Sequence, residues 1–251
     1  ATQRQPYFDV ACCPANLARL MAQLPGLIYS QRRAPATEVF VNLFVASEAD
    51  LDVGGTAVKV AQDTRYPWDG DVAISLTPAT PRTFTLSVRV PGWSRGEAVP
   101  SDLYRDARPA DGAGRPNDGN ARPTATIGDE PVPMTLDHGF LKLTREWKTG
   151  DVVRIHLPMP VRRVLANPAV TDDTDRAVIE RGPLVYSLEA ADQAESPSAL
   201  VLPLDAELTP AFRPDFLGGV EVITGGGVTA IPYFAWNNRG PGEMAVWIRY
   251  R

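Results

Sequence analysis

Hydrophobic and polar positions follow a convincing helical period in one stretch of the chain, near its beginning. Four apolar residues recur at the i, i+3, i+4 and i+7 spacing of a helix face, namely Leu17, Leu20, Met21 and Leu24. Pro14 suits the first helical position, where a missing N–H costs nothing. Pro25 and Gly26 stop the pattern. The sequence therefore predicts one helix that begins beside Cys13 and ends near Leu24.

From residue 38 onward the period changes from helical to alternating. Residues 39–45 form a β-branched and aromatic run, typical of a strand that is buried on both faces. In residues 83–90 apolar side chains alternate strictly with Thr, Ser and Arg, and residues 244–250 alternate again. Further short strands are expected at residues 57–62, 71–76, 140–144, 152–157, 162–166, 177–180, 184–189, 220–223 and 228–235.

The segments between these runs are rich in turn residues. Residues 31–37 are polar and are interpreted as a linker, and residues 96–131 as a long surface excursion. The turn at 148–151 is expected to join the strands at 140–144 and 152–157 as a pair. Gly225, Gly226 and Gly227 lack the Lys-Ser/Thr of a phosphate loop, so they too are interpreted as a turn.

The repeated short strands predict a mostly β protein with tandem β-sandwich modules. The 24 prolines and 20 glycines suit such a strand-and-turn chain. The expected division is residues 1–31 for the helical segment, 32–165 for a first sandwich region and 166–251 for a second. The sequence starts with Ala1 and reaches its helix within fifteen residues, which is expected of a portion of a larger protein.

Composition excludes several partners. The chain has 251 residues, 44% of them hydrophobic, and a net charge of −5, so electrostatics gives no case for nucleic acid or an anionic membrane. No apolar run is long enough for a transmembrane helix, and no basic and apolar signal segment opens the chain. Free thiols are typical of reducing compartments, so a cytoplasmic location is expected.

Cys12 and Cys13 are the only cysteines of the chain. Neighbouring Cα atoms lie about 3.8 Å apart, below the roughly 4.4 Å minimum of ordinary disulfides, so they are not expected to bridge each other. Two free thiols, two metal ligands or one of each role all fit the spacing, and so do two small buried apolar side chains at a helix start. At a helix N-terminus the positive end of the dipole favours thiolate over thiol.

Other candidate residues are weaker. His138 precedes Gly139 and is interpreted as a turn residue, and His156 as a packed or surface residue of a strand. A zinc site needs about four ligands, so a metal site fails within this chain unless further ligands lie outside it. The five tryptophans could stack on sugar rings, but core or sandwich-edge positions are favoured. Residues 232–242, with aromatics, amides and Arg239 on a turn, form the second candidate binding surface.

The residues at 12–20, Cys-Cys-Pro-Ala-Asn-Leu-Ala-Arg-Leu, resemble glycoside hydrolase family 127, the bacterial β-L-arabinofuranosidases and their relatives. The family pattern is Cys-Cys-Pro-Pro-Asn at a helix start, and Ala15 replaces its second Pro here, which leaves room for a subgroup with another sugar specificity. The likeness extends over nearly all of the chain, through stretches at residues 41–44, 89–93, 147–151, 157–161, 181–186 and 236–247.

This resemblance implies a fold and a chemistry. Members have an (α/α)6 barrel followed by β-sandwich domains, so residues 1–31 would hold the last barrel helix and the remainder of the barrel would be absent from this chain. The resemblance makes Cys12 the catalytic nucleophile and a zinc ligand, and Cys13 a second zinc ligand. The barrel would supply the general acid/base Glu, the substrate pocket and a Glu and a Cys that complete the zinc site.

The resulting expectation is the C-terminal part of a retaining glycoside hydrolase that acts on arabinofuranose-containing glycans and is inactive as this fragment. Retention needs a nucleophile and an acid/base on opposite sides of the anomeric carbon. Two alternatives stay open: a non-catalytic β-sandwich module that binds glycan or supports a barrel, and a redox or metal-storage thiol pair.

Overall fold

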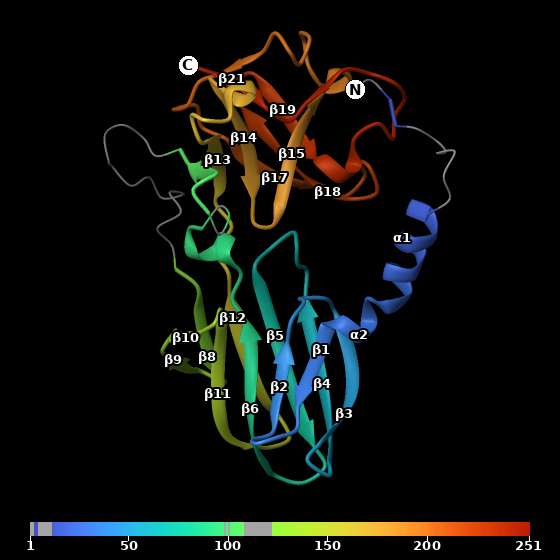
Figure 1. Cartoon of the computed structure of the whole chain (residues 1–251), viewed down its shortest axis with the longest axis vertical. Coiled ribbons are helices and arrows are strands. Elements are labelled where there is room, and N and C mark those ends of the chain that lie inside the picture. Colours follow the sequence, from blue (N-terminus) through green and yellow to red (C-terminus); the bar gives the residue numbers. More distant parts are fainter. Residues whose placement is uncertain (1–2, 5–11, 98, 100, 108–121) are drawn as a thin grey trace. The chain divides into compact units, whose positions relative to one another are not determined.

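The structure is a computed structural model that describes residues 3–4, 12–97, 99, 101–107 and 122–251, and these are mostly strand (Figure 1). The strands belong to two compact units. One comprises the described residues of 12–91 and 122–157, the other those of 3–4, 92–107 and 158–251. The expected boundary after residue 165 lies inside strand β13 (Val161–Ala166) of the second unit. The mostly β fold predicted from the sequence is confirmed.

Two helices, α1 (Cys12–Gln23) and α2 (Pro25–Ile28), occupy the predicted helical region. The first helix ends at Gln23 as predicted, but Pro25 and Gly26 open the short second helix instead of ending the helical region. The expected linker at 31–37 is wrong in its first part, because strand β1 (Tyr29–Arg32) pairs antiparallel with β2 (Glu38–Val41). Strand β1 lies at a sheet edge and alternates half-buried and exposed residues, so its sequence carries almost no apolar signal.

The first sheet of this unit has the order β1-β2-β6-β11-β10. Strand β2 runs parallel to β6, and the remaining pairs are antiparallel. The predicted strand at 83–90 is confirmed as β6, and its residues Leu86 and Val88 are fully buried. Besides β1 and β2, the first sheet contains β6 (Arg82–Arg89), β11 (Phe140–Trp147) and β10 (Leu136–Asp137).

The second sheet of this unit has the order β3-β4-β5-β12-β8-β9. Its central strands bury one face, through Val60, Ile74 and Val153. Gln62 on β4 donates a hydrogen bond of 3.0 Å to the hydroxyl of Tyr29 on β1, which ties the two sheets of the sandwich together. The strands are β3 (Ser47–Val53), β4 (Thr56–Thr64), β5 (Asp71–Pro78), β12 (Asp151–His156), β8 (Thr124–Ile127) and β9 (Glu130–Val132).

Strands β11 and β12 were expected to pair with each other, and this is wrong. The turn between them exists, with the Asp151 N–H donating to the Lys148 carbonyl at 3.1 Å. However, β11 pairs with β6 in the first sheet and β12 with β5 and β8 in the second. Trp147, which is fully buried, closes the end of β11 in the core. A short turn can cross between two packed sheets, and periodicity does not reveal which sheet a strand joins.

The second unit forms a ten-stranded mixed sheet with the main order β16-β21-β14-β15-β19-β18-β17. Strand β16 pairs parallel with β21, and β13 links β14 to β7. The buried core of this unit is made by Ile179, Tyr186, Leu188, Leu202, Leu208, Ile223, Val228, Ala230 and Ile248. The further strands are β7 (Tyr104–Asp106), β14 (Arg176–Arg181), β15 (Leu184–Glu189), β16 (Val201–Leu202), β17 (Thr209–Arg213), β18 (Val220–Gly225), β19 (Val228–Pro232), β20 (Met244–Ala245) and β21 (Ile248–Tyr250).

Two sequence-based expectations in this region need correction. The single strand at 244–250 is broken into β20, which pairs with β15, and β21, which pairs with β14. The excursion at 96–131 contains β7, β8 and β9, while its residues 98, 100 and 108–121 lie outside the described part of the chain. The glycine turn is confirmed: a Cβ on Gly225 would lie 2.0 Å from the Glu207 carbonyl oxygen, so only glycine fits there.

Candidate functional site

The paired cysteines lie in the first turn of α1, and both side chains are exposed. Their sulfur atoms are 3.8 Å apart and no disulfide joins them, as the sequence predicted. The helix was expected to begin beside Cys13 with Pro14 first, but it begins at Cys12. The first four N–H groups of any helix lack an intrahelical acceptor, so Pro14 loses nothing at the third position either.

The apolar face of α1 is exposed to solvent in the described structure. Leu17 is 60% exposed, Leu20 48% and Met21 60%, and no residue of α1 is buried. A twelve-residue helix is marginal in water without packing against a partner. An apolar stripe of this kind is typical of a surface that packs against other protein. The cysteines therefore lie at the end of a helix that presents an unpartnered apolar face.

The described residues do not complete a metal site. Among them, no group of three or more His, Cys, Asp or Glu side chains is arranged to hold a metal ion. Two thiolates match zinc in kind and supply half of the ligands of a four-coordinate site. The residues present thus fit one half of a zinc site, and the other ligands would have to come from outside the described part of the chain.

The two histidines are engaged elsewhere. His138 has a positive φ of 50° and its side chain is 94% exposed beside Asp137, so the turn interpretation is confirmed. His156 lies on the exposed face of β12, with its Nδ1 2.7 Å from an oxygen of Asp71. Its prediction as a surface residue of a strand is also confirmed. Neither histidine joins the cysteines.

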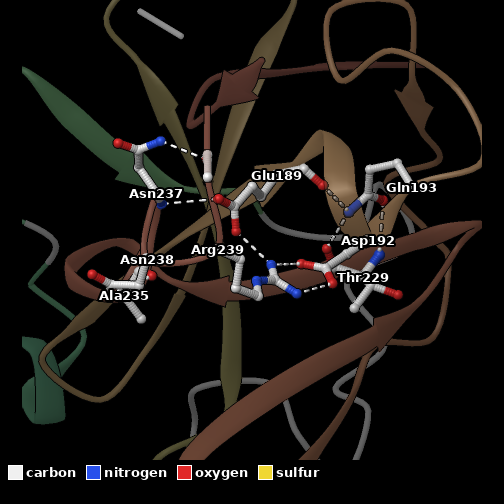
Figure 2. Close-up of polar contacts among 9 residues, drawn as sticks. Glu189, Asp192, Gln193, Thr229, Ala235, Asn237, Asn238 and Arg239 are labelled. Atoms are coloured by element: carbon white, nitrogen blue, oxygen red, sulfur yellow. Dashed lines mark hydrogen bonds and ion pairs between the residues drawn. The ribbon is translucent and has the colours of Figure 1, made fainter. Parts of the chain in front are cut away.

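The second candidate surface, residues 232–242, is held together by an ion-pair network around the buried Glu189 (Figure 2). Arg239 donates to both oxygens of Asp192, at 2.6 and 2.5 Å, and also to Glu189, which is 2% exposed. The other Glu189 oxygen accepts the backbone N–H of Asn237 at 2.9 Å. The bonds from Asp192, and next those from Glu189, raise the pKa of Arg239 against the opposing effect of burial.

These contacts show what the polar residues of this segment do. The guanidinium of Arg239 and the backbone of Asn237 fix the loop to strand β15 and the 3-10 turn Ala190–Asp192. Arg4 adds a hydrogen bond of 2.8 Å to the Phe234 carbonyl and lies over the ring of Trp236. The Arg239 side chain, predicted as part of a binding surface, therefore stabilises the loop through contacts within the chain. The sequence pattern could not show this contact, because Glu189 lies fifty positions away.

The tryptophans are mainly structural. Trp147 is fully buried and donates to the Phe84 carbonyl at 3.1 Å, and Trp236 is 7% exposed. The remaining three, Trp68, Trp93 and Trp247, are half-buried. This distribution confirms the preference for core and edge positions over an open stacking platform. None of the described helices is long and apolar enough to cross a bilayer.

Comparison with known families gives two matches that together span most of the chain. Residues 38–159 match the family model described as the β-L-arabinofuranosidase, GH127 middle domain. Residues 161–249 match the glycoside hydrolase family 127 C-terminal domain. The two matched segments meet close to the division between the two compact units, at residues 157 and 158.

Individual relatives agree. A curated non-reducing end β-L-arabinofuranosidase of Bifidobacterium longum subsp. longum is 31% identical over 99% of this chain and 38% of its own length. A solved GH127 β-arabinofuranosidase is 34% identical with a TM-score of 0.88, covering 99% of this chain and 40% of that one. A GH127 β-L-arabinofuranosidase from Geobacillus stearothermophilus T6 is 35% identical with a TM-score of 0.84, over 100% and 39% of the two chains. The chain therefore spans about two fifths of the length of these relatives.

Proposed function

Because this chain belongs to glycoside hydrolase family 127, we propose that it is the C-terminal part of a retaining glycosidase that removes β-L-arabinofuranose from glycans. Cys12 is the nucleophile in this proposal, and Cys13 is a zinc ligand. The relatives of known activity are named β-L-arabinofuranosidases, and they are longer than this chain. The proposal concerns the whole protein of which these residues form a part.

The placement of the cysteines is the observation that carries the proposal. Both lie in the first turn of α1, at the helix end where backbone N–H groups have no intrahelical acceptor. Both are exposed and neither is consumed by a disulfide. An exposed thiolate at a helix start can reach a substrate carbon, whereas a buried thiol cannot.

Retaining hydrolysis assigns clear tasks to such a thiolate. The Cys12 sulfur would attack the anomeric carbon and form a thioglycoside bond while the glycosidic C–O bond breaks. A general acid about 5 Å away protonates the leaving oxygen, then acts as the base that activates water. Water finally displaces the sulfur and restores the original anomeric configuration. We assign the acid/base to the longer protein, because among the described residues no group of three or more His, Cys, Asp or Glu side chains includes Cys12.

Zinc fits the thiol pair in kind. Cys13, and Cys12 in its resting state, would hold the ion together with ligands from the rest of the protein. When bound, zinc would favour the thiolate form and fix the sulfur positions. We take the departure at Ala15 to change the stiffness of the helix entry and not the chemistry, because the helix includes Ala15 without a second proline.

The test is the stereochemical course of the reaction in the longer protein. Proton NMR of the hydrolysis of an aryl β-L-arabinofuranoside should show the β-anomer of free arabinose first, followed by slow mutarotation. First release of the α-anomer would contradict a covalent Cys12 intermediate, because single displacement inverts the centre.

A second candidate function is a non-catalytic β-sandwich module that binds glycan. One observation favours it independently of the cysteines, namely a hollow on the outer face of the sheet that contains β4, β5, β12 and β8. The two functions are compatible within one protein.

A further inference from the structure

The hollow lies in the unit formed by residues 12–91 and 122–157, on the solvent side of its second sheet, whose strands are labelled in Figure 1. It has a volume of about 510 Å³, within the range of small-molecule sites. Its walls come from the end of β4, the start of β5, β12 and β8. Because adjacent strands form the walls, they are positioned by the backbone hydrogen bonds of the sheet.

The strand register explains why the surface is hollow at this place. Ala73 on β5 lies opposite Asp63 on β4 and opposite Arg154 on β12, and Arg154 lies opposite Thr126 on β8. All four residues face outward, since their neighbours Val72 and Ile155 are buried. The short Ala73 side chain between two long ones leaves a depression with a carboxylate on one side and a guanidinium on the other.

Two of the lining charges are available to a ligand. The side chains of Asp63 and Arg154 have no hydrogen-bond or ion-pair partner among the described residues. Neighbouring strands lie about 4.8 Å apart, so the backbones of Asp63 and Arg154, two strands apart, are separated by roughly 10 Å. That separation accommodates one sugar-sized ring with a hydrogen bond at each edge.

A second row of lining residues is already ordered. His156 Nδ1 lies 2.7 Å from an Asp71 oxygen, and the Thr64 hydroxyl donates to the Asp71 carbonyl at 2.6 Å. The Asp71 N–H donates to Asp69 at 3.2 Å. These contacts hold the wall of the hollow and leave further acceptor positions on both carboxylates.

The charges of the hollow define the class of ligand. Three aspartates, Asp63, Asp69 and Asp71, lie in the same lining as Arg65, Arg154 and His156, so neither sign of charge dominates. A strong anion or cation gains little from such a lining, and the described carboxylates are not arranged as a metal site. A neutral molecule with neighbouring hydroxyl groups can donate to a carboxylate and accept from a guanidinium at the same time.

We propose that this hollow is a binding subsite for one unit of a neutral sugar, with Asp63 and Arg154 as its two principal contacts. Only the choice of arabinose as the sugar rests on the proposed function. The lining contains no Phe, Tyr or Trp on which a sugar could stack, so binding by a few hydrogen bonds is weak, roughly millimolar. Such a subsite would hold a branched glycan near the enzyme.

The experiment is an NMR titration of the 251-residue chain, labelled with ¹⁵N, against methyl β-L-arabinofuranoside and, separately, methyl β-D-xylopyranoside. Saturable shifts are expected at the amides around Ala73 and Arg154. Arg154→Met should weaken binding about tenfold, the effect of losing one charge-assisted hydrogen bond. Asp63→Asn should weaken it less, because the amide keeps an acceptor.

The matched control is Lys59→Met, which removes a long cation from the exposed face of β4 outside the hollow. It should bind sugar as the unaltered chain does. Binding of the xyloside alone would support the subsite while removing arabinose as its ligand. No shift with either glycoside, equal loss in Lys59→Met, or a preference for CaCl2 over both glycosides would overturn the proposal. Circular dichroism of each variant verifies that it folds.

Discussion

Buried charged side chains of this chain each contact a partner of opposite charge. Glu189 is 2% exposed and meets Arg239, and Glu38 is 1% exposed and meets Arg32, with Lys142 3.8 Å away. An unpaired charge inside a protein costs several kcal/mol, so removing one partner is far more harmful than removing a surface charge. Glu189 and Arg239, like Glu38 and Lys142, are far apart in the sequence, so no local sequence pattern predicts these ion pairs.

Replacing Arg239 with Met should lower the free energy of unfolding by about 3 kcal/mol, because Glu189 is left buried without its cation. Urea denaturation followed by tryptophan fluorescence measures this. Arg249→Met, an exposed position on β21, is the matched control and should stay within about 0.5 kcal/mol. Equal effects of the two substitutions would show that the network contributes nothing to stability.

Glu180 gives the fold a pH dependence of known sign. Burial raises the pKa of Glu180 above its ordinary value near 4.5, and the Arg162 guanidinium offsets part of that rise. From about pH 4.5 up to the raised pKa, the folded state binds more protons than the unfolded state, so stability falls as the pH rises.

Glu180→Gln cannot titrate and should therefore lose less stability than the unaltered chain across that window. Urea midpoints at several pH values above 4.5 measure the difference. Glu195→Gln, an exposed carboxylate of the same unit, is the control and should follow the unaltered chain. Parallel curves for Glu180→Gln and the unaltered chain would contradict the assigned effect of burial.

At the scale of elements, strands with several apolar residues were predicted, and strands with few apolar residues were missed. Strand β6 has Phe84 and Leu86 buried in a strict alternation and was found from sequence. Strand β3 has the sequence SEADLDV, and β17 is mostly exposed, so neither shows an apolar face. The pairing of β11 with β6 depended on contacts between distant segments. The cysteine pair was predicted at a helix start, where the structure places it, whereas side chains that join it from distant segments are beyond local sequence reasoning.

Helix α1 should contribute almost nothing to the stability of this chain by itself, because its apolar face is exposed. Leu17→Ala should change the free energy of unfolding by less than about 0.5 kcal/mol. Leu86→Ala, at a fully buried position, should cost about 3 kcal/mol. Chemical denaturation of both variants provides the comparison. A loss of several kcal/mol for Leu17→Ala would mean that the stripe already has a partner in this chain.

At the scale of the whole molecule, the chain contributes two β units and a helix bearing the thiol pair, about two fifths of the length of its relatives. The 251-residue chain alone should not hydrolyse aryl β-L-arabinofuranosides, because it holds neither a described acid/base near Cys12 nor a complete ligand set for zinc. A release assay with p-nitrophenyl β-L-arabinofuranoside, with and without added zinc, measures this. Zinc-dependent turnover by the chain alone would contradict the proposal that the acid/base and further zinc ligands come from the longer protein.

The most direct test of the central claim is the identity of the residue that carries the sugar. The longer protein is treated with an alkylating arabinofuranose analogue directed at the nucleophile, digested and analysed by mass spectrometry. The account predicts an adduct on Cys12, with protection by substrate. Loss of activity in a cysteine variant would be less informative, since either substitution should also weaken the proposed zinc binding. An adduct mainly on Cys13, or on a carboxylate with both thiols intact, would contradict the proposed roles.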